Sequence, residues 1–310
     1  MQTQSKTIPK SSSRSWTRLA VIGLGIIALV CVVAYFALGA YIADQFSRPE
    51  RYALTQTPAA YGMKYENVAF ESAVDHIPLR GWYIDSPGDK VILQLHGRNG
   101  TRDAGSGLAV AQMFVQNNYD VLMFDFRGHG ESGGERYSIG LLEVRDVAGA
   151  LNYLKTRGVQ DVGVIGFSMG AATTLNAAPD LPAMRAVVAD SAFADINLLL
   201  DEQLPQETGL PAWVNPGVLL MGKLLYGIDL AANRPVSAIA RLKDRPVFLI
   251  HGTKDDLVPV HHVELLAQAD AANPNLSVWI LDGVGHTDAF DDANAEYRAR
   301  VLDFFARNLQ

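Results

Sequence analysis

The pentapeptide Gly166-Phe167-Ser168-Met169-Gly170 constrains the fold of this chain more than any other stretch. It follows the apolar run 162–165, which is typical of a strand, and precedes the small-residue run 171–175, which is compatible with a helix. A serine on such a sharp strand-to-helix turn needs small residues two positions before and after it, because the two backbones approach closely there. Both glycines of the pentapeptide meet this need. We therefore predict a nucleophile elbow with Ser168 at its apex.

A serine hydroxyl is a weak nucleophile at neutral pH, so Ser168 requires a general base and a carboxylate that orients this base. Candidates for both follow later strand-like runs. Asp255 comes after the apolar run 246–250, and His286 lies in a glycine-bearing loop after the run 276–281. We expect Ser168, Asp255 and His286 to form a catalytic triad in this chain order.

Two further motifs follow apolar runs upstream of the elbow. They are His96-Gly97-Arg98-Asn99-Gly100 and Asp125-Phe126-Arg127-Gly128-His129-Gly130-Glu131-Ser132. These motifs, the elbow and the loops of Asp255 and His286 occur in the order typical of one superfamily. In them the chain resembles the α/β-hydrolase superfamily, in the group of serine esterases, lipases, thioesterases and peptidases related to monoacylglycerol lipase. The resemblance runs from about Tyr65 to the C-terminus. Haloalkane dehalogenases share this fold but carry aspartate at the elbow, so the serine argues against their chemistry.

The resemblance also implies an oxyanion hole. Two backbone N–H groups must point at the oxygen that becomes negative in the tetrahedral intermediate. In the family they belong to the residue after the elbow serine and the residue after the His-Gly pair, which are Met169 and Arg98 in this sequence. The Met169 amide would also begin a helix, where unpaired N–H groups favour negative charge. The Arg98 side chain has two interpretations, attraction of an anionic substrate or a structural pairing.

Two other acids compete with Asp255 for the role of orienting carboxylate. Asp256 is its neighbour, and Asp190 ends the strand-like run 186–189, after which some relatives carry the acid. The family pattern His-Gly-x-x-Asp-x-x-Val-Pro selects Asp255, and the other two stay open as alternatives. Asp125 is expected to brace its own turn.

The remaining histidines are expected to shape loops or to pack, and they are His76, His96, His129, His251, His261 and His262. No pair of them has the spacing of a His-Glu-x-x-His zinc motif, and the single cysteine excludes thiolate zinc sites. We therefore expect neither a metal nor a cofactor.

Residues 19–42 contain no charged side chain. As a helix these residues would measure about 36 Å, enough to cross a hydrocarbon core of about 30 Å. We expect a retained transmembrane anchor. A cleaved signal peptide is the alternative, although its apolar core should be only about 7–15 residues long and residues 37–40 make a poor cleavage site. Lipoprotein processing at Cys31 is disfavoured, because Val30 stands where a small residue is required.

The charges on either side of this span differ. The segment before it carries only basic charges, on Lys6, Lys10, Arg14 and Arg18. After it, Arg48 and Arg51 are accompanied by the acidic Asp44 and Glu50. This asymmetry predicts a cytoplasmic N-terminus and a catalytic domain on the extracytoplasmic side, which is the periplasmic or extracellular face of a bacterium. The one cysteine lies inside the span, so the exported domain would contain no disulfide.

We divide the chain into a basic cytoplasmic tail at 1–18, the anchor at 19–42, a linker at 43–64 and an α/β-hydrolase domain at 65–310. Within this domain, strand-like runs alternate with helical patterns such as 138–155. This alternation predicts an α/β fold with a mostly parallel, eight-stranded sheet and helices on both faces.

Nearly 60 residues separate Asp190 from the next strand-like run, far more than the usual connection of about 2–6 residues. We expect a small cap insertion at about 191–240. Its sequence is more apolar than a solvated loop tolerates, so it would line an acyl pocket, contact lipid or pack on the sheet. A substrate with an aliphatic or aromatic acyl part would suit the first two roles.

The formal net charge is −7, and no basic run lies outside the tail, so nucleic-acid binding has no electrostatic support. The favoured function is a membrane-anchored serine hydrolase that cleaves a carboxylic ester of a lipid-like small molecule through an acyl-enzyme. A peptidase, a thioesterase or an acyltransferase on the same triad is the alternative within enzymes. A non-catalytic binding protein on a hydrolase fold is the alternative from another class.

Overall fold

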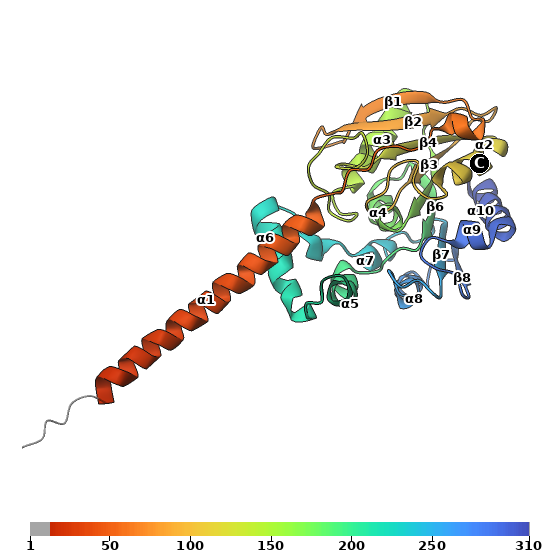
Figure 1. The fold of residues 1–310 in the computed structure, drawn as a ribbon. Coiled ribbons are helices and arrows are strands. Elements are labelled where there is room, and N and C mark those ends of the chain that lie inside the picture. The colour runs from red at the N-terminus through yellow and green to blue at the C-terminus, as the bar shows by residue number, and fades with distance from the viewer. Residues whose placement is uncertain (1–12, 310) are drawn as a thin grey trace, which may run out of the picture.

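The computed structural model describes residues 13–309, and a long N-terminal helix, α1 (Ser13–Ser47), leads from one side into the α/β domain (Figure 1). The predicted tail residues Lys6 and Lys10 lie outside this described part. By length and composition α1 can cross a membrane, but an N-terminal signal sequence would pass the same test. The helix extends beyond the predicted span at both ends.

Eight strands form one sheet, and their bounds are β1 (Glu66–Glu71), β2 (Pro78–Ile84), β3 (Lys90–Leu95), β4 (Tyr119–Asp125), β5 (Val162–Phe167), β6 (Met184–Asp190), β7 (Val247–Gly252) and β8 (Leu276–Leu281). Their order is β1-β2-β4-β3-β5-β6-β7-β8. Strand β2 runs antiparallel to β1 and β4, and every other neighbouring pair is parallel. The predicted mostly parallel, eight-stranded sheet is confirmed.

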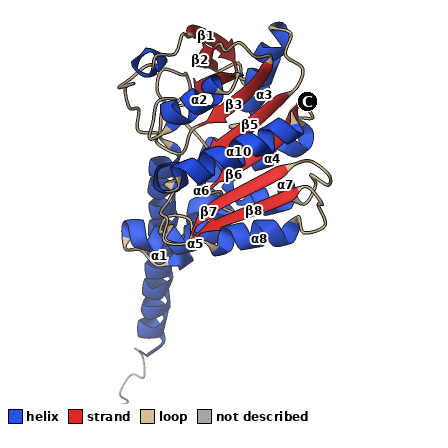
Figure 2. Ribbon diagram, turned by 90° about the vertical axis from the view of Figure 1, so that its right-hand side faces the viewer, coloured by secondary structure: helices blue, strands red, loops and turns tan. Residues whose placement is uncertain are grey.

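Helices cover both faces of this sheet (Figure 2). One face carries α2 (Gly107–Gln116), α9 (Ala289–Asp292) and α10 (Asn294–Asn308), and the other carries α3 (Val144–Thr156), α4 (Met169–Ala177), α7 (Pro235–Ile239) and α8 (His261–Ala269). Successive strand residues point to opposite faces, so Leu93 of β3 joins one core cluster and Ile92 the other. Because β3 to β8 are parallel, their carboxyl ends lie along one edge of the sheet, and this sheet is buried on both faces.

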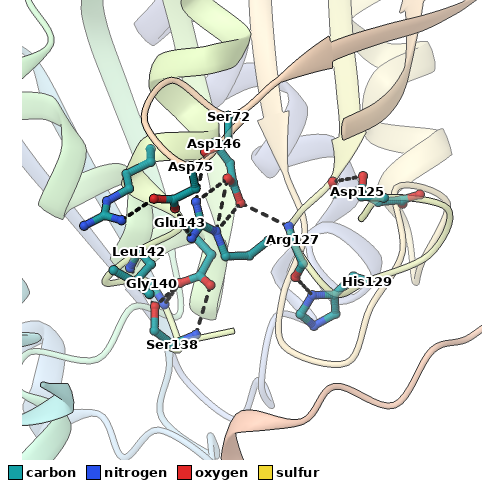
Figure 3. A network of polar contacts seen from close by, with 12 residues as sticks. Ser72, Asp75, Asp125, Arg127, His129, Ser138, Gly140, Leu142, Glu143 and Asp146 are labelled. Carbon is teal, nitrogen blue, oxygen red and sulfur yellow. Dashed lines mark hydrogen bonds and ion pairs between the residues drawn. The ribbon is translucent and has the colours of Figure 1, made fainter. Parts of the chain in front are cut away.

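The helix predicted at 138–155 begins six residues later than expected, at α3. The buried carboxylate of Glu143 accepts hydrogen bonds from the backbone amides of Ser138 at 2.9 Å and Gly140 at 2.8 Å (Figure 3). Gly140 has a φ of 104°, which no helical residue adopts. The segment is thus a turn wrapped around one carboxylate, and only the rest of the pattern is helical.

Arg127 holds the turn after β4 in place (Figure 3). Its guanidinium donates to Asp146 on α3 at 2.8 Å and to Asp75, in the turn between β1 and β2, at 2.6 Å. Burial raises the pKa of Asp146 to about 6, against the hydrogen bonds from Arg127, which lower it. Three segments that are distant in sequence are joined by this one side chain.

A cap lies between β6 and β7, as the length of this connection predicts. It contains α5 (Ile196–Thr208), α6 (Asn215–Tyr226) and the short 3-10 helices Ala212–Val214 and Leu230–Ala232, and α7 then returns the chain to the sheet. Helix α6 lies beside the C-terminal end of α1 (Figure 1). Ile42 and Ala43 of α1 are buried there in a small apolar cluster with Leu204, Val214 and Val218 of the cap. The last part of the apolar span therefore contacts protein.

The segment expected as a linker, 43–64, also contacts the hydrolase domain. The Arg51 side chain donates to the carbonyl oxygen of Ser132 at 2.6 Å, in the turn that Arg127 braces. Further along, the carboxylate of Asp103 accepts hydrogen bonds from the backbone amides of Thr55 and Gln56, at 2.7 and 2.9 Å. The chain thus runs along the domain surface between α1 and β1, held by hydrogen bonds.

Candidate active site

Ser168 stands between the end of β5 and the start of α4. Its φ of 53° and ψ of −115° are a strained combination for a residue with a side chain. A Cβ on Gly166 would lie 2.3 Å from the carbonyl oxygen of Gly170, and a Cβ on Gly170 would lie 2.4 Å from that of Leu95. Neither position can accept a side chain without movement of the backbone. This is the crowding from which the sequence predicts an elbow.

Asp255 and His286 lie in the loops that follow β7 and β8. The Oδ2 atom of Asp255 is 2.7 Å from the Nδ1 atom of His286. The other oxygen, Oδ1, accepts hydrogen bonds from the amides of Val258 at 2.7 Å and Leu257 at 3.1 Å. Because the carboxylate accepts at Nδ1, this nitrogen carries the hydrogen, and Nε2 keeps a free lone pair. Nε2 is buried and has no hydrogen-bond partner among residues 13–309.

The charge of Asp255 follows from its surroundings. Burial raises the pKa of its carboxyl group, but the hydrogen bonds with His251 and His286 hold the pKa well below its usual range. The Nε2 atom of His251 lies 3.3 Å from Asp255 Oδ2 and 2.7 Å from the carbonyl oxygen of Val258. Asp255 is therefore ionised at neutral pH and can stabilise a positive charge on His286.

The two competing acids have other surroundings. Asp190 is fully buried and accepts hydrogen bonds from the hydroxyl groups of Tyr297 and Ser191, both at 3.1 Å. Burial raises the pKa of Asp190 to about 6, although these hydrogen bonds lower it. Asp256 is exposed to solvent. In the described part of the chain, Asp255 is the only one of the three with a hydrogen bond to His286.

The turn after β3 abuts the elbow, since a Cβ on Gly97 would lie 3.4 Å from the Cβ of Ser168. His96 ties this turn to the loop after β4. Its Nε2 accepts the backbone N–H of Phe126 at 3.0 Å, and its Nδ1 donates to the carbonyl oxygen of Gly97 at 2.7 Å. Burial lowers the pKa of His96 to about 4, so this neutral form persists. His129 plays a similar part, because its Nε2 accepts the amide of Asn99 at 3.3 Å.

The two amides assigned to the oxyanion hole lie on either side of this contact. Met169 is the first residue of α4, where a backbone amide has no acceptor within its own helix. The amide of Arg98 has no acceptor among the described residues. Two free donors in adjoining turns are what an oxyanion requires, and their use stays a prediction.

The Arg98 side chain is paired within the protein. Its Nε donates to the hydroxyl group of Tyr137 at 2.9 Å, and its Nη1 lies 3.6 Å from the carboxylate of Glu207 on α5. The guanidinium also lies 5.0 Å from the centre of the Phe46 ring, near the end of α1. Arg98 thus joins the core, the cap and α1 beside the elbow. No sequence signal identifies Tyr137, Glu207 or Phe46 as its partners, because none belongs to a motif.

Ser168 and His286 line one cavity of about 420 Å³. Arg98 and Glu207 form part of its polar wall, and its apolar lining includes Met123, Phe167, Leu257 and Phe290. A volume of this size is within the range of small-molecule sites. The cavity contains no second carboxylate among its described lining residues, so Glu207 alone supplies negative charge there.

One cluster outside this cavity has residue types that bind metals. Glu202 on α5 lies 2.8 Å from Nε2 of His261 and 3.0 Å from Nε2 of His262, both on α8. The Nδ1 atom of His262 accepts the backbone N–H of Ala194 at 3.0 Å, so in the neutral ring Nε2 carries the hydrogen and donates to Glu202. The observed hydrogen bonds therefore satisfy these groups and join the cap to the core.

Comparisons with known proteins identify the family of this chain. The family described as serine aminopeptidase, S33, matches residues 86–244. The protein YfhR of Escherichia coli (strain K12) is 32% identical over 251 residues, which are 77% of this chain and 80% of YfhR. WAV2 of Arabidopsis thaliana, described as an alpha/beta hydrolase domain-containing protein, is 25% identical over 81% of this chain and 82% of its own length.

Among solved structures, the esterase Pf2001 of Pyrococcus furiosus superposes with a TM-score of 0.72 at 28% identity, over 84% of this chain and 100% of the esterase. The chain belongs to the serine aminopeptidase S33 family of α/β-hydrolases. The predicted resemblance and the predicted fold are confirmed, and the family and fold identify a hydrolase.

Proposed function

We propose that this protein is a serine hydrolase in which Ser168, His286 and Asp255 are the catalytic triad and that its substrate is a carboxylic ester. The observation that carries the proposal is the 2.7 Å hydrogen bond from His286 to Asp255 in the loops beside the elbow. It leaves Nε2 of His286 free and buried in a cavity that Ser168 also lines. An elbow without a base, or a base without an orienting carboxylate, would not support this chemistry.

In the proposed reaction, Nε2 of His286 takes the proton of the Ser168 hydroxyl as its oxygen attacks the ester carbonyl. The ionised Asp255 keeps the imidazole oriented and stabilises its positive charge. The amides of Met169 and Arg98 hold the negative oxygen of the tetrahedral intermediate. His286 then gives its proton to the leaving alcohol. Water, activated by the same base, hydrolyses the acyl-enzyme and frees Ser168.

Amide hydrolysis is a second candidate, because the family is described by an aminopeptidase activity. An aminopeptidase must bind the α-ammonium group of its substrate, and Glu207 is the carboxylate in the cavity wall. Its 3.6 Å pairing with Arg98 already balances that charge. The apolar lining and the similarity to an archaeal esterase favour an ester with an aliphatic or aromatic acyl part.

We further propose that α1 is a retained anchor, with the N-terminus in the cytoplasm and the catalytic domain on the extracytoplasmic side. The uncharged span and the basic charges before it support this arrangement. Carbonate extraction should leave the protein in the membrane, and protease added outside spheroplasts should digest the catalytic domain. A soluble mature chain that lacks about the first 40 residues would instead identify a cleaved signal peptide.

A fluorophosphonate probe tests the hydrolase proposal, because it reacts only with an activated serine. The wild type should be labelled, and Ser168→Ala should not, while both keep the same thermal unfolding profile. A panel of p-nitrophenyl esters of increasing chain length, set against aminoacyl p-nitroanilides, then separates esterase from peptidase. Labelling of the Ser168→Ala variant would refute the assignment of the nucleophile, and no labelling of the wild type would favour a binding protein.

A further inference from the structure

Large apolar side chains are exposed on the cap next to α1. Trp213 is 66% exposed, and on α6 the exposed fractions of Leu220, Leu224 and Leu225 are 42%, 67% and 52%. Water-facing surfaces seldom gather several such side chains on one short helix. Lys223, the one charged residue of α6, pairs with Asp229 at 2.6 Å.

The position of α6 along α1 is fixed by specific contacts. The hydroxyl group of Tyr35 accepts the amide of Gly217 at 2.9 Å and donates to the carbonyl oxygen of Trp213 at 3.2 Å. The rings of Tyr35 and Trp213 stack with their centres 5.8 Å apart. A Cβ on Gly39 would lie 2.7 Å from the backbone of Gly217, so the two helices are as close as glycine allows.

The two helices run in the same direction from this contact. Gly222 approaches Ala43, where an added Cβ would lie 3.8 Å from the Cβ of Ala43, and the Tyr226 hydroxyl donates to Asp44 at 3.0 Å. Figure 1 shows α6 alongside the end of α1 that enters the domain. Each level of α6 therefore corresponds to a known level of α1.

These levels place part of the cap within the apolar span. Tyr35 lies seven residues before Ile42, or about 10 Å below the end of the span. A hydrocarbon core of about 30 Å takes up roughly 20 residues, which end near Leu38 when counted from Leu19. Trp213 then lies at the level of the hydrocarbon, Leu220 about 5 Å beyond its boundary, and Leu224 further out in the headgroup layer.

We propose that Trp213 and the exposed leucines of α6 are embedded in the outer leaflet beside α1, so that the cap is a membrane-bound part of the enzyme. This inference rests on the proposed anchor. Lipid is the occupant, because the exposed surface of α6 continues that of the uncharged span and shares its depth. Asp44, which pairs with Arg136 at 2.7 Å and with Arg48 at 2.9 Å, marks the level where charged groups return.

The same contacts bring the catalytic cavity close to the membrane. Phe46 contacts the Arg98 guanidinium at the wall of the cavity and lies eight residues after Leu38, or about 12 Å beyond the hydrocarbon. Glu207 of α5 also reaches this wall from the cap. An amphipathic ester held in the outer leaflet would meet the cavity without complete transfer into water. Esters that reside in the membrane are thus the substrate class that this position of the cavity favours.

Fluorescence quenching tests the depth of α6. In full-length protein carrying Cys31→Ser, one cysteine is introduced at a time by Leu220→Cys, Leu224→Cys or Asp161→Cys, and labelled with an environment-sensitive dye. Asp161 precedes β5, at the sheet edge opposite the elbow, and serves as the control. In vesicles of phosphatidylcholine and phosphatidylglycerol, lipid-borne quenchers should quench position 220 most, 224 less and 161 least. Aqueous iodide should show the reverse order.

Hydrolysis supplies a second measurement. The double change Leu220→Ser and Leu224→Ser should leave turnover of p-nitrophenyl acetate unchanged and lower that of a long-chain p-nitrophenyl ester held in vesicles by about threefold or more. The matched control is Val278→Ser with Ile280→Ser. These two exposed side chains belong to β8, which lies on the side of the domain away from α1 (Figure 1), and the change should alter the turnover of neither ester.

The outcomes separate this inference from the proposals on which it rests. In one outcome, the wild type floats with vesicles and hydrolyses the soluble ester while the labels at 220 and 224 of the cysteine variants respond to iodide like the label at 161. This result would overturn the embedding of α6. Protection of these labels in detergent, together with cross-linking between chains, would identify a second copy as the occupant and also overturn it. A chain that does not float refutes the anchor and this inference together. Absent turnover of the soluble ester would refute the hydrolase alone.

Discussion

The sheet edge with the proposed triad and the cap with α1 are stabilised in different ways. At the sheet edge, each proposed catalytic side chain follows a strand, and its position is set by hydrogen bonds and, at the elbow, by Gly166 and Gly170, where a side chain would require the backbone to move. The cap rests on α1 through an apolar cluster and the close Gly39–Gly217 contact, and side-chain hydrogen bonds and ion pairs also join it to the core. Two of these are Glu207 with Arg98 and Glu202 with His262. Rigidity at the site therefore comes from the sheet, while the cap is held partly by the core and partly by a helix that is also the candidate membrane segment.

The largest expected effect falls on the base of the sheet-edge site. His286→Ala should lower kcat by about 10⁴-fold, because the Ser168 hydroxyl then has no proton acceptor. Steady-state hydrolysis of p-nitrophenyl butyrate measures this loss. The double variant Ser168→Ala with His286→Ala should be no worse than either single one, since the pair acts as a unit. Losses that multiply would contradict this coupling.

Replacing the orienting acid should have the next largest effect. Asp255→Asn should lower kcat by about 10²–10⁴-fold, because the amide can donate to Nδ1 and stabilise the wrong tautomer. Asp256→Asn is the matched control and should stay within about threefold of the wild type, as a solvent-exposed change usually does. If Asp256→Asn or Asp190→Asn were the most damaging change in a folded protein, the acid would come from a different position.

The contact between cap and α1 can be broken without touching the sheet. Gly39→Val should force α1 away from Gly217 and cost about 1–3 kcal/mol of cap stability, as overpacking does. Limited proteolysis in detergent should then cut the cap faster, while hydrogen exchange of the sheet amides stays unchanged. Gly25→Val, in the same helix but with no atom within 4 Å of its added Cβ, is the control. Equal protection of the cap in both variants would show that it does not depend on α1.

The smallest expected effect concerns Asp190, which burial holds at a pKa of about 6. A carboxyl group whose folded-state pKa is raised stabilises the fold below its usual pKa of about 4, and this contribution is lost as the pH rises through 6. Asp190→Asn removes the titration. Its urea midpoint should exceed that of the wild type at pH 8 by more than at pH 4, with kcat changed less than by Asp255→Asn. Parallel pH curves for the two proteins would contradict the raised pKa.

Local patterns were enough to predict the eight-stranded sheet, the elbow and the cap, since glycine spacing and apolar runs reflect backbone constraints between near neighbours. The helical pattern also predicts a start at Ser138, six residues before α3 begins. The Glu143 carboxylate holds residues 138–140 in a turn and is buried by other segments. A helical sequence pattern does not reveal this burial. The proposed triad could thus be predicted from local motifs although its members lie far apart in the sequence, whereas the partners of Arg98, which belong to no motif, could not.

By itself the sequence determined that residues 19–42 form an uncharged apolar run and that Ser168, Asp255 and His286 each follow a strand. It did not determine which surroundings the apolar residues would find. Hydrophobicity measures the free energy of leaving water and is almost the same for lipid and for a protein core. Only the tertiary structure decided that Tyr35 and Gly39 contact the cap, and that the Arg98 guanidinium donates to Tyr137 and pairs with Glu207. These contacts depend on the three-dimensional approach of segments up to 182 residues apart.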